Sequence, residues 1–388
     1  MFKVFLVTSF AILLSFLALA AWIYLAFFNG QFWKPVFDDP APDPAQWPSI
    51  DIIVPARNEA DALPRSLPTL LGQDYPGRWR VILVDDHSED GTGAMAQAIA
   101  FEGQKTSRLT VVNAPDLPAG WSGKVAAMQA GTTTSNADYI LFTDADIEHP
   151  ADSLRRLAAR AVDRNIDLVS RMVKLHCAYP SEKLLIPAFV YFFAMLYPFK
   201  RVNDPESKVA AAAGGVMLLR RKTLDHIGGL ARIKSALIDD CALARAIKDY
   251  GGTSGTPSRI ELTLSRDIKS ARPYPRIQDI THMIARTAYT QLRYSPLLLA
   301  GTIIGMAILF LAPLMLFLTG WPICSEAALA AWMLMVLIYI PMTRFYELPF
   351  AWSLALPLAA AIYIVATIDS ARLYRQGKGG QWKGRMQA

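Results

Sequence analysis

The sequence predicts an α/β fold, a doubly wound and largely parallel sheet, with an apolar membrane region at each end of the chain. Three observations lead to this prediction. Short apolar runs alternate with amphipathic helical stretches through the centre of the 388-residue chain, as in strand–helix–strand units. Acidic side chains directly follow several of these runs, where open sheets bind their ligands. Apolar residues make up 53% of the chain, and the excess lies at its two ends.

Residues 1–28 predict an N-terminal transmembrane anchor. The stretch Val4–Phe28 is apolar throughout and long enough to cross a bilayer, for which about 20 residues suffice. Ala18-Leu19-Ala20 resembles a signal-peptide cleavage site, but the apolar stretch continues past it, whereas a secretory apolar core usually has ~7–15 residues. We therefore expect a retained anchor, followed by a Pro- and Asp-rich linker over residues 29–48.

Residues 49–295 are predicted to form the α/β domain. Short apolar runs bounded by turn residues predict strands, and they lie at 49–56, 81–84, 109–113, 139–143, near 168–169 and within 210–219. Leu63, Leu67, Leu70 and Leu71 fall on one face of a predicted helix. Further helices are expected after Thr92, at 152–163 and within 236–250, where Gly251-Gly252 is a typical helix end.

The segment 184–199 is strongly apolar and aromatic but too short to cross a membrane comfortably. Lys183 precedes it and Lys200-Arg201 follows it. This pattern is typical of a helix lying in the membrane interface. A helix buried in the core of the domain would have a similar residue pattern, so both interpretations stay open.

Residues 296–370 predict a C-terminal transmembrane region with three candidate spans, at 297–319, 327–342 and 350–368. The tail, 371–388, contains five basic residues and no acidic residue, so the positive-inside rule places it in the cytosol. Three full crossings from a cytosolic domain would instead leave the tail outside. Either one segment is re-entrant or interfacial, or the segment 184–199 and the tail behave differently from these expectations.

Charge and cysteine content exclude some classes of protein. The net charge is +6, yet residues 29–295 contain 32 Lys and Arg against 30 Asp and Glu. The excess positive charge flanks the apolar ends, as expected near anionic lipid headgroups, and no basic stripe with interleaved aromatic residues predicts nucleic-acid binding. Cys177, Cys241 and Cys324 are far apart, which indicates neither a disulfide framework nor a zinc site and fits a reducing compartment.

Two carboxylates, Asp144 and Asp146, follow the predicted strand 139–143. On an extended backbone both side chains would point to the same side and could hold one hard cation, Mg²⁺ or Mn²⁺, through oxygen ligands. Such a cation would take the phosphates of a nucleotide. The alternative is an Asx-turn that caps the helix beginning near Pro150.

Asp85 and Asp86 end the strand 81–84. A carboxylate at this position can accept hydrogen bonds from a base or from a ribose hydroxyl. The alternative is turn chemistry. We expect a functional role for one of the two aspartates and a capping role for Ser88 and Asp90.

Gly120-Trp121-Ser122-Gly123-Lys124 precedes a short predicted helix. Backbone N–H groups at a helix start, with a lysine beside them, suit a pyrophosphate, although the Walker A spacing is absent and an ordinary surface lysine is the alternative. Asp239-Asp240 begins the helix within 236–250. Acidic residues often cap a first turn, but two adjacent carboxylates can also raise each other's proton affinity and supply a general base.

These motifs together resemble those of family 2 glycosyltransferases with a GT-A fold, over roughly Ile50 to Arg293. The resemblance is carried by Val54-Pro55-Ala56-Arg57-Asn58-Glu59, Val84-Asp85-Asp86-His87-Ser88, Gly123-Lys124, Thr143-Asp144-Ala145-Asp146 and Asp239-Asp240. It implies a nucleoside pocket lined by Pro55, Arg57, Glu59 and either Asp85 or Asp86. It also implies that Lys124 lies near the donor phosphates, Asp144 near the ribose and Asp146 on Mg²⁺ or Mn²⁺. Asp240 would be the catalytic base, supported by Asp239.

A second resemblance concerns the acceptor. Processive and ceramide-type members of the family have a Gln/Arg-x-x-Arg-Trp motif, where this chain reads Thr290-Gln291-Leu292-Arg293-Tyr294. Arg293 matches and would join the donor-binding residues, whereas the changes at Thr290 and Tyr294 favour a single sugar transfer. The stretches 185–190, 197–199, 236–245 and 290–297 look like those of hopanoid-biosynthesis-associated glycosyltransferases, which implies a hopanoid or related polycyclic lipid as acceptor.

The expected function is therefore a membrane-bound, inverting, metal-dependent transfer of one sugar from a nucleotide sugar, a UDP-sugar, to a lipid hydroxyl. It would take place on the cytosolic face of a bacterial inner membrane. One alternative is a processive polysaccharide synthase, which predicts an intact Gln-x-x-Arg-Trp motif. Another is a catalytically idle membrane scaffold of the same fold, against which the retained Lys124, Asp144, Asp146 and Asp240 speak. The sequence specifies neither the sugar nor an oligomeric state.

Overall fold

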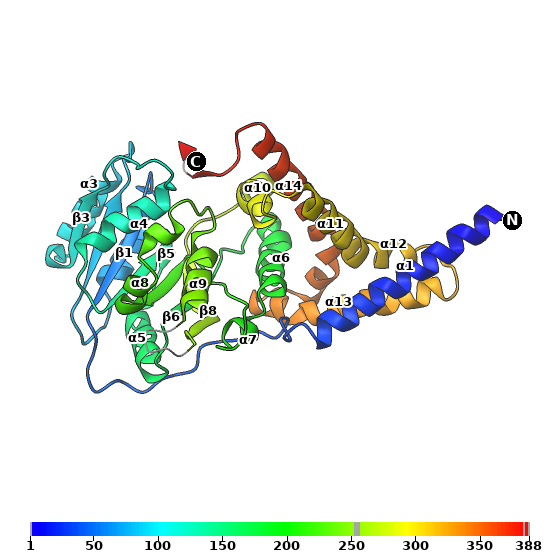
Figure 1. Cartoon of the computed structure of the whole chain (residues 1–388), viewed down its shortest axis with the longest axis horizontal. Coiled ribbons are helices and arrows are strands. Elements are labelled where there is room, and N and C mark those ends of the chain that lie inside the picture. The colour runs from blue at the N-terminus through cyan, green and yellow to red at the C-terminus, as the bar shows by residue number, and fades with distance from the viewer. Residues whose placement is uncertain (1, 252–256, 383–384, 387–388) are drawn as a thin grey trace. The chain divides into compact units, whose positions relative to one another are not determined.

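The computed structural model describes residues 2–251, 257–382 and 385–386. The chain forms two compact units. The helical unit comprises Met1–Pro35, Cys177–Lys200 and Tyr274–Gly379, and the α/β unit comprises Val36–His176, Arg201–Pro273 and Gly380–Ala388. Figure 1 shows the helices and strands of each unit.

The α/β unit is built on one sheet of eight strands. These are β1 (Ile50–Ala56), β2 (Trp79–Asp85), β3 (Leu109–Asn113), β4 (Tyr139–Thr143), β5 (Ile147–Glu148), β6 (Leu168–Lys174), β7 (Val216–Arg220) and β8 (Ile260–Ser270). Their order is β3-β2-β1-β4-β7-β6-β8-β5. The pairs β2–β3, β1–β2, β1–β4 and β6–β8 are parallel, whereas β4–β7, β6–β7 and β5–β8 are antiparallel. The predicted α/β class is thus confirmed, and the sheet is mixed rather than largely parallel because β7 runs against both of its neighbours.

The same unit contains helices, several of which pack on the sheet. They are α2 (Leu63–Leu71), α3 (Thr92–Glu102), η1 (Thr106–Arg108), α4 (Gly123–Thr134), α5 (Ser153–Asp163), α8 (Arg221–His226), η2 (Leu230–Ile233) and α9 (Asp239–Tyr250), with the short α7 (Phe199–Val202) at a junction of the two units. The four leucines predicted on one helix face are all buried in α2. The α9 helix ends before Gly251, whose φ of 74° suits glycine, and Gly252 lies outside the described residues.

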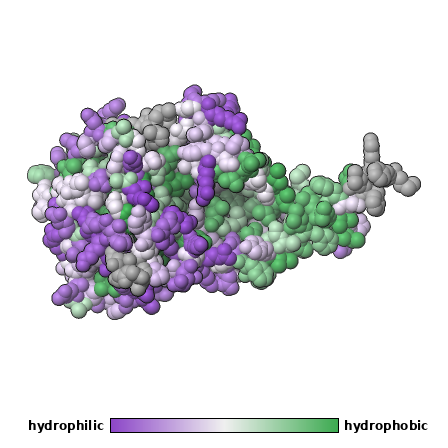
Figure 2. All heavy atoms as spheres, viewed as in Figure 1, coloured by the Kyte–Doolittle hydropathy of each residue, from purple (hydrophilic) through white to green (hydrophobic). Residues whose placement is uncertain are grey.

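The helical unit contains the apolar ends of the chain. Its elements are α1 (Phe2–Phe27), α6 (Pro180–Leu196), α10 (Ile277–Gln291), α11 (Pro296–Met306), the π-helical turn η3 (Ala307–Leu311), α12 (Ala312–Phe317), α13 (Cys324–Phe345), η4 (Phe350–Ala355) and α14 (Leu356–Arg375). After it, two short strands, β9 (Gln381–Trp382) and β10 (Arg385–Met386), pair with each other. Among the described residues, four stretches are long and apolar enough to cross a membrane, namely Val7–Phe27, Pro296–Phe317, Cys324–Phe345 and Phe350–Arg375. Figure 2 shows hydrophobic residues over α1, α12 and α13.

The boundaries of the units differ from the domain predicted over 49–295. Residues 177–200 and 274–295 belong to the helical unit, because α6 packs on α10, α13 and α14, and α10 packs on α14. The fully buried Tyr191 and the buried Phe192 anchor α6 among these helices. The predicted segment 184–199 therefore forms a helix that packs on other helices of the helical unit. It is not part of the core of the α/β unit.

Candidate active site

The candidate site lies where three adjacent parallel strands end. In the order β2-β1-β4, Ala56 pairs with Asp85, and Ile53 pairs with Phe142 just before β4 ends. The carboxyl ends of parallel strands meet at one edge of a sheet, where α/β folds bind their ligands. The predicted residues after β1, β2 and β4 therefore start from the same edge, although they are distributed over about 90 positions of the chain.

Lys124, the second residue of α4, lies among carboxylates. Its Nζ is 2.8 Å from Asp144 Oδ1 and 3.5 Å from Asp239 Oδ2, and only 18% of its side chain is exposed. Burial lowers the pKa of Lys124, but the charges of Asp144, Asp239 and Asp240 outweigh it and hold the pKa above its usual value. Lys124 is therefore a charged, buried group and not an ordinary surface lysine.

Asp240 lies at the start of α9, beside this lysine. Its Oδ2 accepts a hydrogen bond from Gly214 N at 2.9 Å, and its Oδ1 accepts one from Cys241 N at 2.7 Å. Burial, followed by the charge of Asp239, raises the pKa of Asp240 to about 6, while Lys124 acts in the opposite direction. A carboxylate with this pKa is ionised at neutral pH and accepts a proton more readily than an ordinary aspartate.

Gly214 keeps the space between these charges small. A Cβ added there would lie 3.3 Å from Lys124 Nζ and 3.4 Å from Asp240 Oδ2. Any larger residue would have to displace the lysine or the carboxylate. The run of small residues at 210–215 thus brings a backbone N–H close to Asp240, as close approaches of backbone require.

Asp146 and Glu59 share the guanidinium of Arg272. Arg272 Nε donates to Asp146 Oδ2 at 2.8 Å, and its Nη2 lies 2.8 and 3.0 Å from the two carboxylate oxygens of Glu59. Arg272 follows β8, which pairs with β5 directly after Asp146, and Ala271 N donates to Asp146 O at 2.8 Å. Sequence analysis missed Arg272 because it lies 126 positions from Asp146, and only the β5–β8 pairing brings the two together.

Asp144 and Asp146 follow β4, but they do not themselves lie on an extended backbone, so that part of the prediction is wrong. The chain turns after β4, and Ile147 N donates to Asp144 O at 3.3 Å. As a result each carboxylate has its own cationic partner, Lys124 or Arg272.

The donor set still fits a divalent cation held together with substrate. Within the described ranges no group of three or more His, Cys, Asp or Glu side chains could hold a metal ion alone. Mg²⁺, however, usually binds one or two carboxylates plus substrate phosphates and keeps several waters. Asp146 and Asp144 offer hard oxygen ligands of this kind.

The predicted nucleoside pocket involves β1, β2 and the turn after β2. Arg57 Nη1 donates to Asp86 O at 2.6 Å and lies 3.8 Å from Asp86 Oδ2. Asp86 is 3% exposed, and Pro55 is buried within β1. Asp85 Oδ1 instead accepts a hydrogen bond from Ser88 N at 3.0 Å. Asp85 thus stabilises the turn, and Asp86 is the better candidate for ligand contact.

Of the capping roles predicted for Ser88 and Asp90, that of Asp90 at the start of α3 is confirmed, whereas Ser88 bonds to the loop after β1 and does not cap the helix. Ser88 Oγ accepts a hydrogen bond from Asn58 N at 3.0 Å, and Asp90 Oδ1 accepts one from Thr92 N at 3.0 Å. His149, which sequence analysis did not single out, supports the end of β4: its imidazole nitrogens lie 3.0 Å from Thr143 Oγ1 and 3.2 Å from Ser153 Oγ. Burial lowers the pKa of His149 to about 4, so it is neutral and serves as a structural brace.

Arg293 belongs to the helical unit and not to the α/β unit. It is exposed, lies between α10 and α11, and has a left-handed backbone with φ of 51°. Its role toward the donor stays a prediction.

The comparisons with known proteins agree with this geometry. Residues 51–228 match the model of the family described as Glycosyl transferase family 2, a range that includes Lys124, Asp144 and Asp146 but ends before Asp239. The fold is similar to that of the mannosyltransferase PcManGT from Pyrobaculum calidifontis, solved in complex with GDP-Man and Mn²⁺. The TM-score is 0.56 at 19% identity, covering 93% of this chain and 98% of that chain. The α/β unit thus has a GT-A fold.

Curated relatives match a shorter part of the chain. An N-acetylglucosaminyltransferase of Rhizobium leguminosarum bv. trifolii is 33% identical over 124 residues, 31% of this chain and 65% of the relative. A dodecaprenyl-phosphate galacturonate synthase of Rhizobium johnstonii is 30% identical over 129 residues, 33% of this chain and 36% of the relative. The chain therefore spans less than two thirds of the length of either relative. About a third of the chain is thus similar in sequence to proteins named as sugar transferases or synthases.

Proposed function

We propose that this protein transfers a single sugar from a nucleotide sugar, a UDP-sugar, to the hydroxyl group of a membrane lipid. The observation that carries the proposal is the partly buried cluster of Lys124, Asp144, Asp239 and Asp240 at the carboxyl edge of the sheet. It combines a fixed positive charge, which suits a diphosphate leaving group, with a carboxylate of raised pKa, which suits deprotonation of an alcohol.

In the proposed reaction, Asp240 takes the proton of the acceptor hydroxyl while the hydroxyl oxygen attacks the anomeric carbon of the donor sugar. The bond between that carbon and the diphosphate oxygen breaks on the opposite face, so the configuration inverts. Lys124 stabilises the charge that develops on the leaving diphosphate, and Asp239 raises the proton affinity of Asp240. A divalent cation held by Asp146 together with the donor phosphates would add Lewis-acid neutralisation of the same charge.

Arg57, Glu59 and Asp86, with Pro55 behind them in β1, are the proposed contacts to the nucleoside. Asp86 is buried beside Arg57, and both follow strands whose ends meet at the site edge. Asp144 is the proposed ribose contact, since it directly follows β4, the strand that pairs with β1, and lies 2.8 Å from Lys124 Nζ. Arg293 is kept as a proposed contact to the donor.

The acceptor is proposed to be a lipid alcohol, a hopanoid or related polycyclic lipid. The apolar helices of the chain provide a route to a lipid substrate, and the local resemblance described above favours this class. Several relatives have a polyprenyl phosphate in their names, a dodecaprenyl-phosphate galacturonate synthase and undecaprenyl-phosphate 4-deoxy-4-formamido-L-arabinose transferases among them. A phosphate oxygen needs no general base, and a dianion would be repelled by Asp239 and Asp240, so the acidic cluster favours an alcohol. We place the reaction on the cytosolic side of a bacterial inner membrane.

The test uses membranes that contain the full-length protein, a panel of labelled UDP- and GDP-sugars, and mass analysis of the lipid extract. We expect one UDP-sugar to add the mass of a single sugar to a phosphorus-free lipid, and chelation of divalent cations to suppress the transfer. Asp240→Asn should lower the rate by roughly 10²–10⁴-fold while the donor still binds.

Other outcomes contradict specific parts of the proposal. Products with several added sugars would indicate a processive synthase. A phosphorus-containing product would indicate a lipid phosphate acceptor. A protein that neither transfers nor hydrolyses any donor, with folding intact, would indicate an idle scaffold.

A further inference from the structure

The two units are joined at five points of the chain, after Pro35, His176, Lys200, Pro273 and Gly379. The α/β unit contains an open sheet with strand edges and many loops. Such a structure cannot lie within lipid, because its backbone polar groups would be left without partners. All five connections must therefore leave the membrane on the one side where the α/β unit lies.

This condition fixes the parity of the crossings. Between Tyr274 and Gly379 the chain starts and ends on the side of the α/β unit, so it crosses the membrane an even number of times. Three stretches in this interval are long and apolar enough to cross, namely Pro296–Phe317, Cys324–Phe345 and Phe350–Arg375. Three is odd, so one of them does not cross.

Two shorter helices mark the membrane face on the side of the α/β unit. The α6 helix is a single 17-residue helix between the connections after His176 and Lys200. A single crossing would place these connections on opposite sides, so α6 stays at this face. The α10 helix, with 15 residues, follows the connection after Pro273 and precedes the first C-terminal span, so it lies at the same face.

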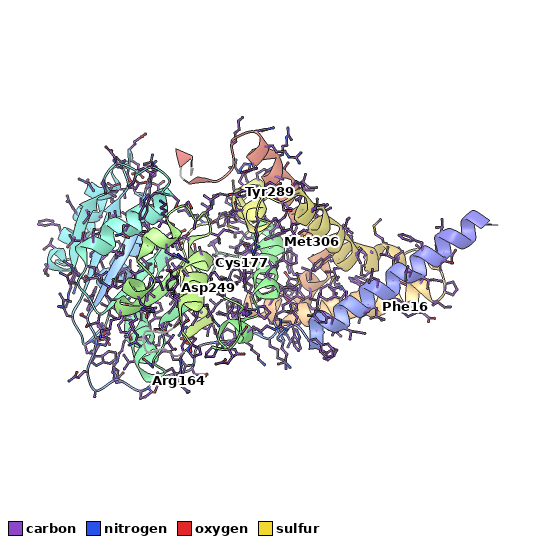
Figure 3. All side chains as sticks on the ribbon, in the orientation of Figure 1. Phe16, Arg164, Cys177, Asp249, Tyr289 and Met306 are labelled. Atoms are coloured by element: carbon purple, nitrogen blue, oxygen red, sulfur yellow. The ribbon has the colours of Figure 1, made fainter. Side chains whose placement is uncertain are left out.

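The helix α14 packs on both of these marker helices. Ser370 Oγ donates to Ala285 O at 2.5 Å and accepts a hydrogen bond from Tyr289 N at 3.0 Å, which joins α14 to α10. Tyr363 OH donates to Leu185 O at 3.0 Å, which joins the middle of α14 to α6. Figure 3 labels Tyr289 on α10, where α10 and α14 meet. The α12 and α13 helices pack on each other and on α1; α13 also touches α6, and α14 also touches α11 and η3, but of the described helices only α14 packs on both α6 and α10.

Both ends of α14 lie near the same face. At its start, Ser353 in η4 is 2.8 Å from Thr343 at the end of α13. At its end, Tyr374 stacks on Tyr294 just before α11, with ring centroids 4.3 Å apart.

The end of α13 is itself at this face. Tyr191 of α6 packs on Tyr339 near the end of α13, with centroids 4.9 Å apart. It also packs on Phe32, just after α1 and before the first connection, at 5.1 Å. A helix of 20 residues is about 30 Å long, so α14, with both ends at one face, runs along that face and not through the bilayer.

We propose that α14 lies in the membrane interface on the side of the α/β unit, and that the chain crosses the bilayer three times, through α1, α11–α12 and α13. The outer face of α14 exposes Leu358, Val365 and Ile368. These residues span about 15 Å of helix, half the ~30 Å of a hydrocarbon core, and the exposed Asp369 and Arg372 follow. An apolar stripe of this kind, ending in charged residues, fits the boundary between headgroups and acyl chains. The inference does not depend on the proposed sugar transfer.

The test labels single cysteines in the full chain with a membrane-impermeant maleimide, applied to vesicles of both orientations. The native cysteines at 177, 241 and 324 are first replaced by serine. Thr319→Cys reports the α12–α13 loop, Glu347→Cys the α13–α14 connection, and Lys378→Cys the end of α14. Glu102→Cys, at the exposed end of α3, marks the side of the α/β unit.

We expect the cysteines at 102, 347 and 378 to react in one vesicle orientation and the cysteine at 319 only in the other. Reaction at 378 from the side of 319 would overturn the proposal, because α14 would then cross. If the variant without native cysteines does not insert into membranes, full-length fusions replace it. A fluorescent protein or an alkaline phosphatase is fused after Ala388, and the result is compared with markers for the side of the α/β unit. A tail reporter on the side opposite the α/β unit would equally overturn it.

Discussion

At the scale of single residues, the pKa of Asp240 depends on two neighbours that act in opposite directions. Burial raises this pKa most, Asp239 raises it further and Lys124 lowers it, which gives a value of about 6. A general base must be deprotonated to act, so the proposed transfer should accelerate as pH rises through about 6. The cluster therefore predicts two variants with opposite effects on one measurable inflection.

Asp239→Asn removes a neighbouring negative charge and should move the inflection of the rate–pH profile below that of the wild type. Lys124→Gln removes a neighbouring positive charge and should move the inflection above it. Single-turnover rates between pH 4.5 and 8.5, normalised to each variant's maximum, provide the measurement. Shifts in the same direction for both variants would exclude Asp240 as the titrating group.

Arg272 predicts a competition for the acidic side of the site. Its guanidinium pairs with Asp146 and Glu59. A divalent cation bound at Asp146 would therefore have to share the Asp146 carboxylate with this guanidinium. The Arg272 side chain is 35% exposed, and ion pairs open to solvent contribute up to about 1 kcal/mol, so Arg272→Gln should tighten Mn²⁺ binding without donor by up to about fivefold. Calorimetry with Mn²⁺ alone measures this.

The matched control for Arg272 is Arg164→Gln, which removes an exposed guanidinium that pairs with the neighbouring Asp163 at the end of α5. It should leave the affinity for Mn²⁺ unchanged. If Arg272→Gln weakened Mn²⁺ binding instead, the arginine would be supporting the cation site and not competing with it.

At the scale of elements, α4 depends on a glycine where it crosses the sheet. A Cβ at Gly131 would lie 2.5 Å from Ile53 Cγ2 and 3.0 Å from Val84 Cγ2. Overpacking of this kind typically costs ~1–3 kcal/mol, more than the ~1 kcal/mol that alanine gains over glycine in a helix. Gly131→Ala should therefore lower the unfolding temperature in detergent.

Gly301→Ala is the control for this prediction, since a Cβ there meets no atom within 4 Å. It should leave thermal unfolding of the α/β unit unchanged. An unchanged or higher unfolding temperature for Gly131→Ala would mean that α4 shifts freely on the sheet, and that it does not fix Lys124 by close packing.

A buried carboxylate holds two connections of the helical unit together. Glu182, fully buried, accepts hydrogen bonds from Ala178 N and Tyr179 N at 2.8 and 2.9 Å and from Tyr274 N at 2.6 Å. Glu182→Gln would turn one acceptor into a donor that faces a backbone N–H, at a cost of ~1–3 kcal/mol or more. We expect a lower unfolding temperature in detergent, whereas Glu326→Gln, in the exposed first turn of α13, should behave as wild type.

Elements were predictable from sequence where their own residues define them. The strands β3 and β4 match the predicted ranges residue for residue, because each is a short apolar run with polar ends. The direction of β7 was not predictable, since a strand has the same residue pattern whichever way it runs. The burial of Lys124 and the contact of Arg272 with Asp146 were not predictable either. Both depend on contacts between residues that are distant in the chain, and local sequence periodicity does not show such contacts.

At the scale of the whole molecule, the three apolar stretches near the C-terminus were correctly predicted to be helical. Their sequence did not predict which of them cross the membrane. The composition of α14 resembles that of a crossing helix. Its contacts with α10 and α6 distinguish it, and these involve residues about 80 to 180 positions away. Hydropathy is a local property. It therefore identifies candidate spans but does not show which of them cross the bilayer and which lie along its surface.

The pairing of α10 with α14 predicts the behaviour of shortened chains. The buried face of α10, with Ile280, Ile284 and Tyr289, is covered by α14. A stop codon after Pro349 should therefore leave this face bare and shorten the protein's half-life in a pulse-chase experiment, whereas a stop after Lys378 should not. Equal half-lives would show that α10 is stable without its partner.

The same pairing has a consequence for the order of biosynthesis. Ser370, which bonds to Tyr289 and Ala285, is synthesised 81 and 85 residues later than these two. A ribosome adds ~5–20 residues per second, so α10 waits roughly 4–17 s for the helix that covers it. During that interval its apolar side faces either lipid or a chaperone, and assembly of the helical unit is completed only when the last helix leaves the ribosome.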